Sequence, residues 1–150
     1  MGMWGVQTFE NDDASEWAMD LEVTKDASLL KLSLNPGESA GEVLEAADGV
    51  LVLCAAEVVA GIARSPRKGI PENVLAWIAA HRGLSVAALV PIAIAGVERV
   101  LSDKSKLNKM WAEDKADYSM WKEDVCGLLT ALKGQPQQSS PIKQPWWKLW

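Results

Sequence analysis

The sequence predicts an all-α fold, a compact bundle of five to seven helices around two apolar central helices. Residues 49–64 are apolar around nearly the whole helical circumference, and residues 85–103 are mostly apolar as well. Such compositions are typical of helices buried on most sides. Small side chains, which let two helix axes approach closely, are expected to face one another between the two segments: Ala55, Ala56, Ala60 and Gly61 against Ala88, Ala93, Ala95 and Gly96.

The first helix is predicted to begin at Asn11 or Asp12, because either side chain can accept hydrogen bonds from free backbone N–H groups. Its apolar positions recur at helical spacing, and it should end near residues 22–24. Residues 26–34 alternate like a strand in part, but we favour a helix because no second strand is available to pair with them. Residues 38–48 are expected to form a weaker helical approach to the central segment.

Proline and glycine mark the ends of the next helices. Residues 72–82 follow Pro71, a residue favoured in the first helical turn, and stop at Gly83, a residue favoured just beyond a helix. Pro91 lies within the predicted helix 85–103. It should either kink that helix or move its beginning to about residue 90.

The last helical stretch, residues 105–132, begins at Ser105, a plausible cap, and carries one apolar stripe. The stripe pauses at Asp114–Asp117, where the sequence allows a break into two helices. The composition then changes to a polar, proline-bearing linker that ends in a tryptophan-rich tail. We therefore predict a helical domain over residues 1–133, which opens with a short irregular N-terminus, and a linker and tail over residues 134–150.

The composition limits the classes of function. The net charge of −5 argues against nucleic acid as a partner, because neutralising phosphates requires a basic face. The sequence shows no secretory signal, and its longest apolar runs look too short to span a bilayer, so we expect a cytoplasmic protein. Cys54 and Cys126 lie in apolar surroundings without a CxxC spacing. We interpret both as small buried side chains rather than a disulfide or a zinc site, and we expect no cofactor.

The N-terminus carries a recognisable motif: Gly-x-Trp-Gly at residues 2–5, then Phe-x-Asn-Asp at residues 9–12, with Trp17 downstream. Further matches are Ala56-Glu57-Val58-Val59-Ala60, Ser105, Leu107, Met110-Trp111 and Trp121. On these residues the sequence resembles bacterial proteins of domain-of-unknown-function family 4259 over residues 1 to about 132. The resemblance implies a small bacterial cytosolic domain and no particular reaction.

Glu57 is the most informative single residue, because it lies within the most apolar helix. An unpaired carboxylate there would be costly and its pKa would rise. We favour a structural role, in which Glu57 bonds the N-terminal backbone, a tryptophan indole N–H, or an arginine such as Arg99. The alternative is a general acid or base in a pocket.

The acids near the N-terminus and the single histidine are weaker candidates. The densest group of oxygen ligands consists of Glu10, Asn11, Asp12 and Asp13, with Glu16, but it lacks the alternating spacing and central glycine of a calcium loop. Helix capping explains them better, and we predict no metal. His81 lies in a last helical turn, where a partly positive side chain suits the helix dipole. No nucleophile or carboxylate stands beside it, so we favour a helix-end role.

Arg64, Arg67 and Lys68 form the one basic cluster in the body of the chain. Three positive charges so close together suit an anionic ligand or an acidic partner. A solvated loop is the commoner explanation of such a cluster.

The tail is a second candidate binding element. Trp146, Trp147 and Trp150 would share one face of a helix, beside Lys143 and Lys148. Exposed tryptophans favour association, so something should cover them: the same molecule, a second copy, a partner protein or a membrane interface. Because two lysines would attach a membrane only weakly, we favour self-association or docking to a protein partner.

These features support three hypotheses of function. The leading one is a non-enzymatic protein-binding module, for example an immunity-type protein that neutralises a toxin. The second is an enzyme with a carboxylate-based site near Glu57 and His81. The third is a peripheral membrane module that acts through the tryptophan-rich tail.

Overall fold

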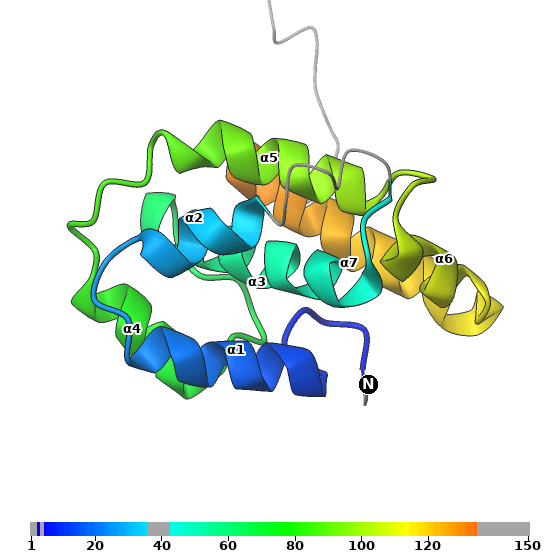
Figure 1. The fold of residues 1–150 in the computed structure, drawn as a ribbon, viewed down its shortest axis with the longest axis horizontal. Helices are drawn as coiled ribbons and strands as arrows, with labels where there is room; N and C mark the ends of the chain where they lie inside the picture. Colours follow the sequence, from blue (N-terminus) through cyan, green and yellow to red (C-terminus); the bar gives the residue numbers. More distant parts are fainter. Residues whose placement is uncertain (1–2, 4, 36–42, 135–150) are drawn as a thin grey trace, which may run out of the picture.

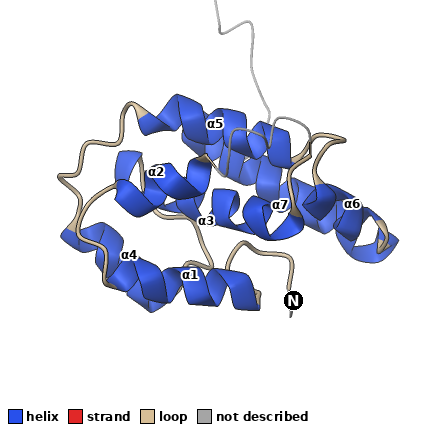
Figure 2. Ribbon diagram, viewed as in Figure 1, coloured by secondary structure: helices blue, strands red, loops and turns tan. Residues whose placement is uncertain are grey.

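The computed structural model describes residues 3, 5–35 and 43–134, and these residues form seven α-helices and no sheet (Figures 1 and 2). The helices are α1 (Asp12–Glu22), α2 (Ser28–Leu34), α3 (Ala46–Ala63), α4 (Glu72–Ala80), α5 (Leu89–Val100), α6 (Lys106–Ala112) and α7 (Lys115–Lys133). The strand-like features of this part of the chain are isolated backbone bridges, such as Leu44 with Ser105. The predicted all-α fold is confirmed, and so is the helix over residues 26–34.

Helix α3 is the centre of the fold, and 13 of its 18 residues are buried. Figure 1 shows it enclosed by α1 and α4 on one side and by α5 on the other, with α7 behind. This burial explains its composition, because a helix with no polar face must be covered all round. Helix α3 begins before the apolar run seen in the sequence and is 18 residues long, with a mean hydropathy of 1.9. By length and composition alone, a helix of this kind could cross a membrane. Since 72% of them are buried in the fold, a core position accounts for this composition.

Helix α5 lies against α3, as the sequence predicts, but one of its faces reaches the surface. Pro91, Ile92 and Ala95 are exposed, so α3 alone occupies the centre. Pro91 stands in the first turn of α5, which begins at Leu89, close to the predicted start. It does not break the helix, because the first N–H groups of a helix need no intrahelical acceptor.

Two glycines allow close helix crossings, and one of them faces a different helix from the one we expected. A Cβ atom at Gly96 of α5 would lie 2.9 Å from Cγ1 of Val52 on α3, as a close α3–α5 crossing requires. A Cβ atom at Gly61 of α3 would lie 2.8 Å from Cδ1 of Ile78. Gly61 therefore packs against α4, and the expectation that it faces α5 is wrong.

Side-chain caps are present at three helix starts, two of which, at Asn11 and Ser105, the sequence predicts. The Asn11 side chain accepts a hydrogen bond from Ala14 N at 2.8 Å, and Ser105 Oγ accepts one from Asn108 N at 3.1 Å. Asp114 caps α7, so the chain does break into two helices near the predicted pause. These interactions satisfy backbone donors that the helices themselves leave free.

Several predicted boundaries need correction, among them the end of α5, which lies at Val100 rather than at residue 103. The approach segment over residues 38–48 lies partly outside the described residues, and residues 43–45 are not helical, because the Leu44 backbone bonds with Lys104 and Lys106 instead. Helix α4 ends at Ala80, two residues before the predicted end, and Gly83 lies in the turn that follows.

The α3–α5 crossing generates a test of the packing. We expect Gly96→Val to lower the free energy of unfolding by about 2 kcal/mol, because the new side chain must displace Val52 from a filled core. Gly83→Val is the matched control, since a Cβ atom there meets no heavy atom within 4 Å; its effect should stay within about 0.5 kcal/mol. Urea unfolding of both variants measures the difference. Equal effects would contradict a close crossing at Gly96.

Candidate functional site: a buried ion network beside a basic cavity

Glu57 lies in the middle of α3 and is 3% exposed. Its Oε2 atom accepts a hydrogen bond from the Thr8 hydroxyl at 2.7 Å and one from Arg67 Nη1 at 2.9 Å. Its Oε1 atom is buried without a hydrogen-bond partner among the described residues. The buried carboxylate is therefore paired, as its position in an apolar helix predicts.

Arg67 joins Glu57 to the last helix. Its Nη2 atom donates to Asp124 Oδ1 at 2.8 Å and to the Asp124 carbonyl oxygen at 3.0 Å. One guanidinium group thus bridges the loop after α3, the core of α3 and the middle of α7. We call Thr8, Glu57, Arg67 and Asp124 the ion network.

The ion network corrects two interpretations of the sequence. The arginine that pairs with Glu57 is Arg67 and not Arg99. Arg67 also does not belong to a solvated loop, because its side chain is only 14% exposed and both ends of its guanidinium are bonded. Its neighbours Arg64 and Lys68 are exposed, as expected of loop cations.

Burial controls the protonation of both carboxyl groups of the ion network. Loss of hydration raises the pKa of Glu57 from 4.5 to about 7, against the opposing effects of Arg67 and the Thr8 hydrogen bond. Burial also raises the pKa of Asp124, again against the effect of the Arg67 charge. A neutral or half-ionised Glu57 near pH 7 is therefore the state that the surrounding core favours.

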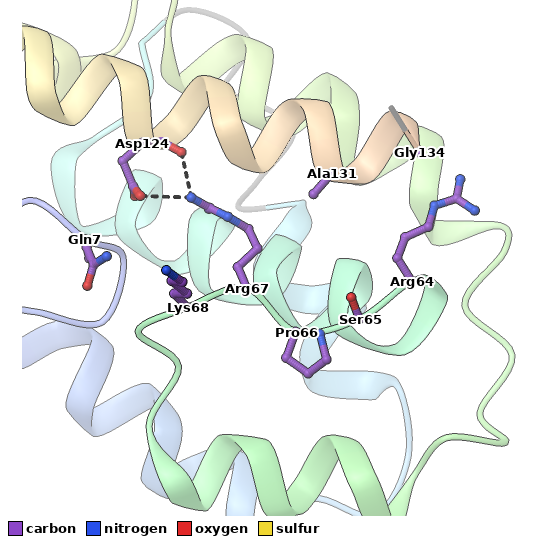
Figure 3. A pocket seen from close by; sticks show the side chains of 9 residues that line it. All are labelled: Gln7, Arg64, Ser65, Pro66, Arg67, Lys68, Asp124, Ala131 and Gly134. Carbon is purple, nitrogen blue, oxygen red and sulfur yellow. Dashed lines mark hydrogen bonds and ion pairs between the residues drawn. The ribbon is translucent and has the colours of Figure 1, made fainter. Parts of the chain in front are cut away.

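A cavity of about 590 Å³ opens beside the ion network. Figure 3 shows Arg67 in its wall, reaching toward Asp124, with Lys68 and Arg64 to either side. The other lining residues are Gln7, Ser65, Pro66, Ala131 and Gly134. We call this the basic cavity. Glu57 does not line it.

The N-terminal acids form no metal site in the part of the chain that the structure describes. Asn11 caps α1 and also donates from Nδ2 to the Thr8 carbonyl oxygen at 3.1 Å. Asp12 and Asp13 occupy the first turn of α1, at the positive end of the helix dipole.

His81 is the residue that caps the carboxyl end of α4, one position beyond the last turn in which the sequence predicts it. Its Nδ1 atom lies 2.7 Å from the Trp77 carbonyl oxygen, and its ring stacks on the Trp77 indole with centroids 3.9 Å apart. Glu57 makes its contacts with Thr8 and Arg67, so the structure does not join these two residues into one site.

Sequence reasoning missed Thr8 and Asp124. The N-terminal motif surrounds Thr8 and was a usable signal, whereas Asp124 is one of several acids on a polar helix face and nothing distinguished it. Cys54 is buried as predicted, and burial raises the pKa of its thiol. The prediction for Cys126 is wrong, because its side chain is exposed on α7. Trp146, Trp147 and Trp150 lie outside the described residues.

The fold and the ion network define a small helical domain in which a buried carboxylate ties the N-terminal segment and α7 to a central helix. The chain belongs to the family described as "Domain of unknown function (DUF4259)", whose sequence profile matches residues 2–124. All four residues of the ion network lie within that range, and the tail lies beyond it. No curated protein and no solved structure matches the chain.

Removing the buried carboxylate tests the structural role of Glu57. We expect Glu57→Ala to lower the free energy of unfolding by about 3 kcal/mol, because it leaves the Thr8 hydroxyl and Arg67 Nη1 without their acceptor in the core. Glu45→Ala is the matched control. It breaks an exposed ion pair with Lys106, of 3.2 Å, and should cost less than about 1 kcal/mol. Thermal or urea unfolding distinguishes them, and an unchanged stability in Glu57→Ala would refute the structural role.

The raised pKa of Glu57 predicts a pH dependence of stability. Between pH 4.5 and about 7 the unfolded chain releases the Glu57 proton while the folded chain keeps it, so the free energy of unfolding falls as the pH rises. We expect the wild type to lose about 3 kcal/mol across this interval relative to Glu57→Gln, which cannot titrate. Glu123→Gln, at an exposed position on α7, is the control. Parallel pH profiles for the wild type and Glu57→Gln would contradict the raised pKa.

Proposed function

We propose that this protein is a non-enzymatic protein-binding domain and that its basic cavity receives an acidic segment of a partner protein. The observation that carries the proposal is the cavity of about 590 Å³ with Arg64 and Lys68 at its edge. Its volume lies within the range of roughly 300–1,000 Å³ that is usual for binding sites. We place this binding in the bacterial cytoplasm.

Two of the three cations at the basic cavity are available to a ligand. Arg67 is paired with Glu57 and Asp124, and its Nη1 and Nη2 atoms both donate hydrogen bonds to them. Neither Arg64 nor Lys68 forms a salt bridge with any described residue. An incoming carboxylate would therefore meet positive charge that is not already compensated.

The surroundings position one of these cations, Arg64. The Arg64 guanidinium lies against Gly134, where a Cβ atom would come within 2.7 Å of Nη2. Gly134 follows the carboxyl end of α7, where free backbone carbonyls carry partial negative charge and attract a cation. A preorganised cation loses less conformational entropy when it binds a carboxylate.

The lining argues for binding rather than catalysis. Ser65 is the one hydroxyl among the described lining residues, and neither a histidine nor a free carboxylate lines the cavity with it. A hydroxyl nucleophile requires a base within hydrogen-bond reach. The pKa of Glu57 near 7 is the observation that favours an enzyme. Because Glu57 is buried behind Arg67 and lines no described cavity, we do not propose one.

Binding of a short polyglutamate peptide to the full chain tests the proposal. We expect the wild type to bind it, and Arg64→Glu with Lys68→Glu to weaken the affinity by about tenfold, because each substitution replaces attraction by repulsion. Binding to the wild type should also weaken at high salt. Isothermal titration calorimetry provides the affinities.

The matched control is Lys104→Glu with Lys109→Glu, which changes the net charge equally. Both lysines are exposed and neither lines the basic cavity. Equal loss of affinity in the two double variants would show a response to net charge alone. Absence of binding to the wild type would also contradict the proposal. Neutralisation of a toxin is one role such a site would suit, and an acidic loop of the toxin would then be its ligand.

A further inference from the structure

A second hollow lies on the face formed by α1, α2 and the beginning of α3, which lie beside one another in Figure 1. It consists of two adjoining cavities of about 330 and 160 Å³ that share Trp17, Asp20 and Leu51 as lining residues. Leu29 and Leu32 complete its apolar floor. Leu32 is 70% exposed and Leu29 and Leu51 are partly exposed, whereas Trp17 is buried, so part of this apolar surface is uncovered in the part of the chain that the structure describes.

Carboxylates surround the apolar floor. Asp13, Glu16, Asp20 and Asp48 line the two cavities, and no lysine or arginine lines either of them. None of the four forms a salt bridge with a described residue. We call this hollow the acidic groove. Its chemistry suits a segment that carries both large apolar side chains and positive charge.

We propose that the acidic groove binds the C-terminal segment of the same molecule, residues 142–150. This segment, IKQPWWKLW, carries Trp146, Trp147 and Trp150 for the apolar floor, and Lys143 and Lys148 for the carboxylates. It contains no acidic side chain. The inference does not depend on the proposed binding of an acidic partner.

Charge also argues against the basic cavity as the binding site of the tail. The tail leaves α7 at Gly134, which lines the basic cavity, so the basic cavity is the first hollow that it meets. There its lysines would face Arg64 and Lys68, and like charges repel. This repulsion disfavours the basic cavity as the binding site of the tail and favours the acidic groove.

The tail is long enough to reach the groove. The tail begins at Gly134, which lies against Arg64 at the carboxyl end of α3. The groove residue Leu51 precedes Arg64 by 13 residues along the same helix. Thirteen helical residues span about 20 Å. Trp146 is 12 residues beyond Gly134, an extended reach of roughly 40 Å. A tether that spans the distance favours binding within one molecule over binding between copies, because the effective concentration of the tail is then on the order of millimolar.

Photocrosslinking in the full chain tests this proposal. Photoreactive benzoylphenylalanine replaces Leu32, whose exposure allows the change without disturbing the core. After irradiation of dilute protein, we expect a species of monomeric mass in which the groove is joined to a peptide from residues 142–150. Lys143→Glu with Lys148→Glu in the same chain should reduce that product severalfold, because the substitutions place acids against acids.

The matched control carries the photoreactive residue in place of Met120, which is 54% exposed on α7 and lines none of the described cavities. Tail crosslinks of equal yield from both positions would show random collision and overturn the proposal. Crosslinked dimers in place of the monomeric product would show that the tail of a second copy binds the groove. Absence of any crosslink to the tail would show that the groove binds a different ligand. Either result would overturn binding within one molecule. Each of these failures leaves the basic cavity and its polyglutamate test unaffected.

Discussion

The burial of Glu57 in the middle of α3 is the constraint on which the rest of the arrangement depends. A carboxyl group in the core requires polar partners, and α3 itself is apolar on every side and supplies none. The partners come from three distant parts of the chain: Thr8 from the N-terminal segment, Arg67 from the loop after α3, and, through Arg67, Asp124 from α7. One buried carboxyl group thus ties the N-terminal segment and, through Arg67, the last helix to the centre of the domain.

This arrangement also determines where charge remains available at the surface. The ion network uses Arg67 internally and leaves Arg64 and Lys68 at the edge of a cavity, while the N-terminal acids gather with Asp48 around the groove formed by α1, α2 and α3. An acidic protein therefore presents two hollows of opposite sign. The proposed binding of an acidic segment at one of them and of the basic tail at the other follows from this separation.

Much of the fold could be predicted, because its signals are local. Asn11, Ser105 and Asp114 cap helices through bonds to residues two or three positions away, so sequence spacing reveals them. The composition of α3 likewise predicts its burial. The errors concern relations between elements: Gly61 packs on α4, Cys126 faces outward, and Arg67 rather than Arg99 meets Glu57. Sequence spacing carries no information on which neighbour a helix face will meet.

By itself, the sequence determined that the chain forms helices, where most of them begin, and that a carboxyl group within α3 must find partners. Those outcomes follow from backbone capping, from helical periodicity and from the cost of burying a charge. Only the tertiary structure decided that Thr8 and Arg67 meet at that carboxyl group, that Asp124 meets Arg67, and that Arg64 and Lys68 line a different hollow from the acids of α1. The physical reason is that these contacts join residues up to 57 positions apart, and they depend on how whole helices pack rather than on any local preference.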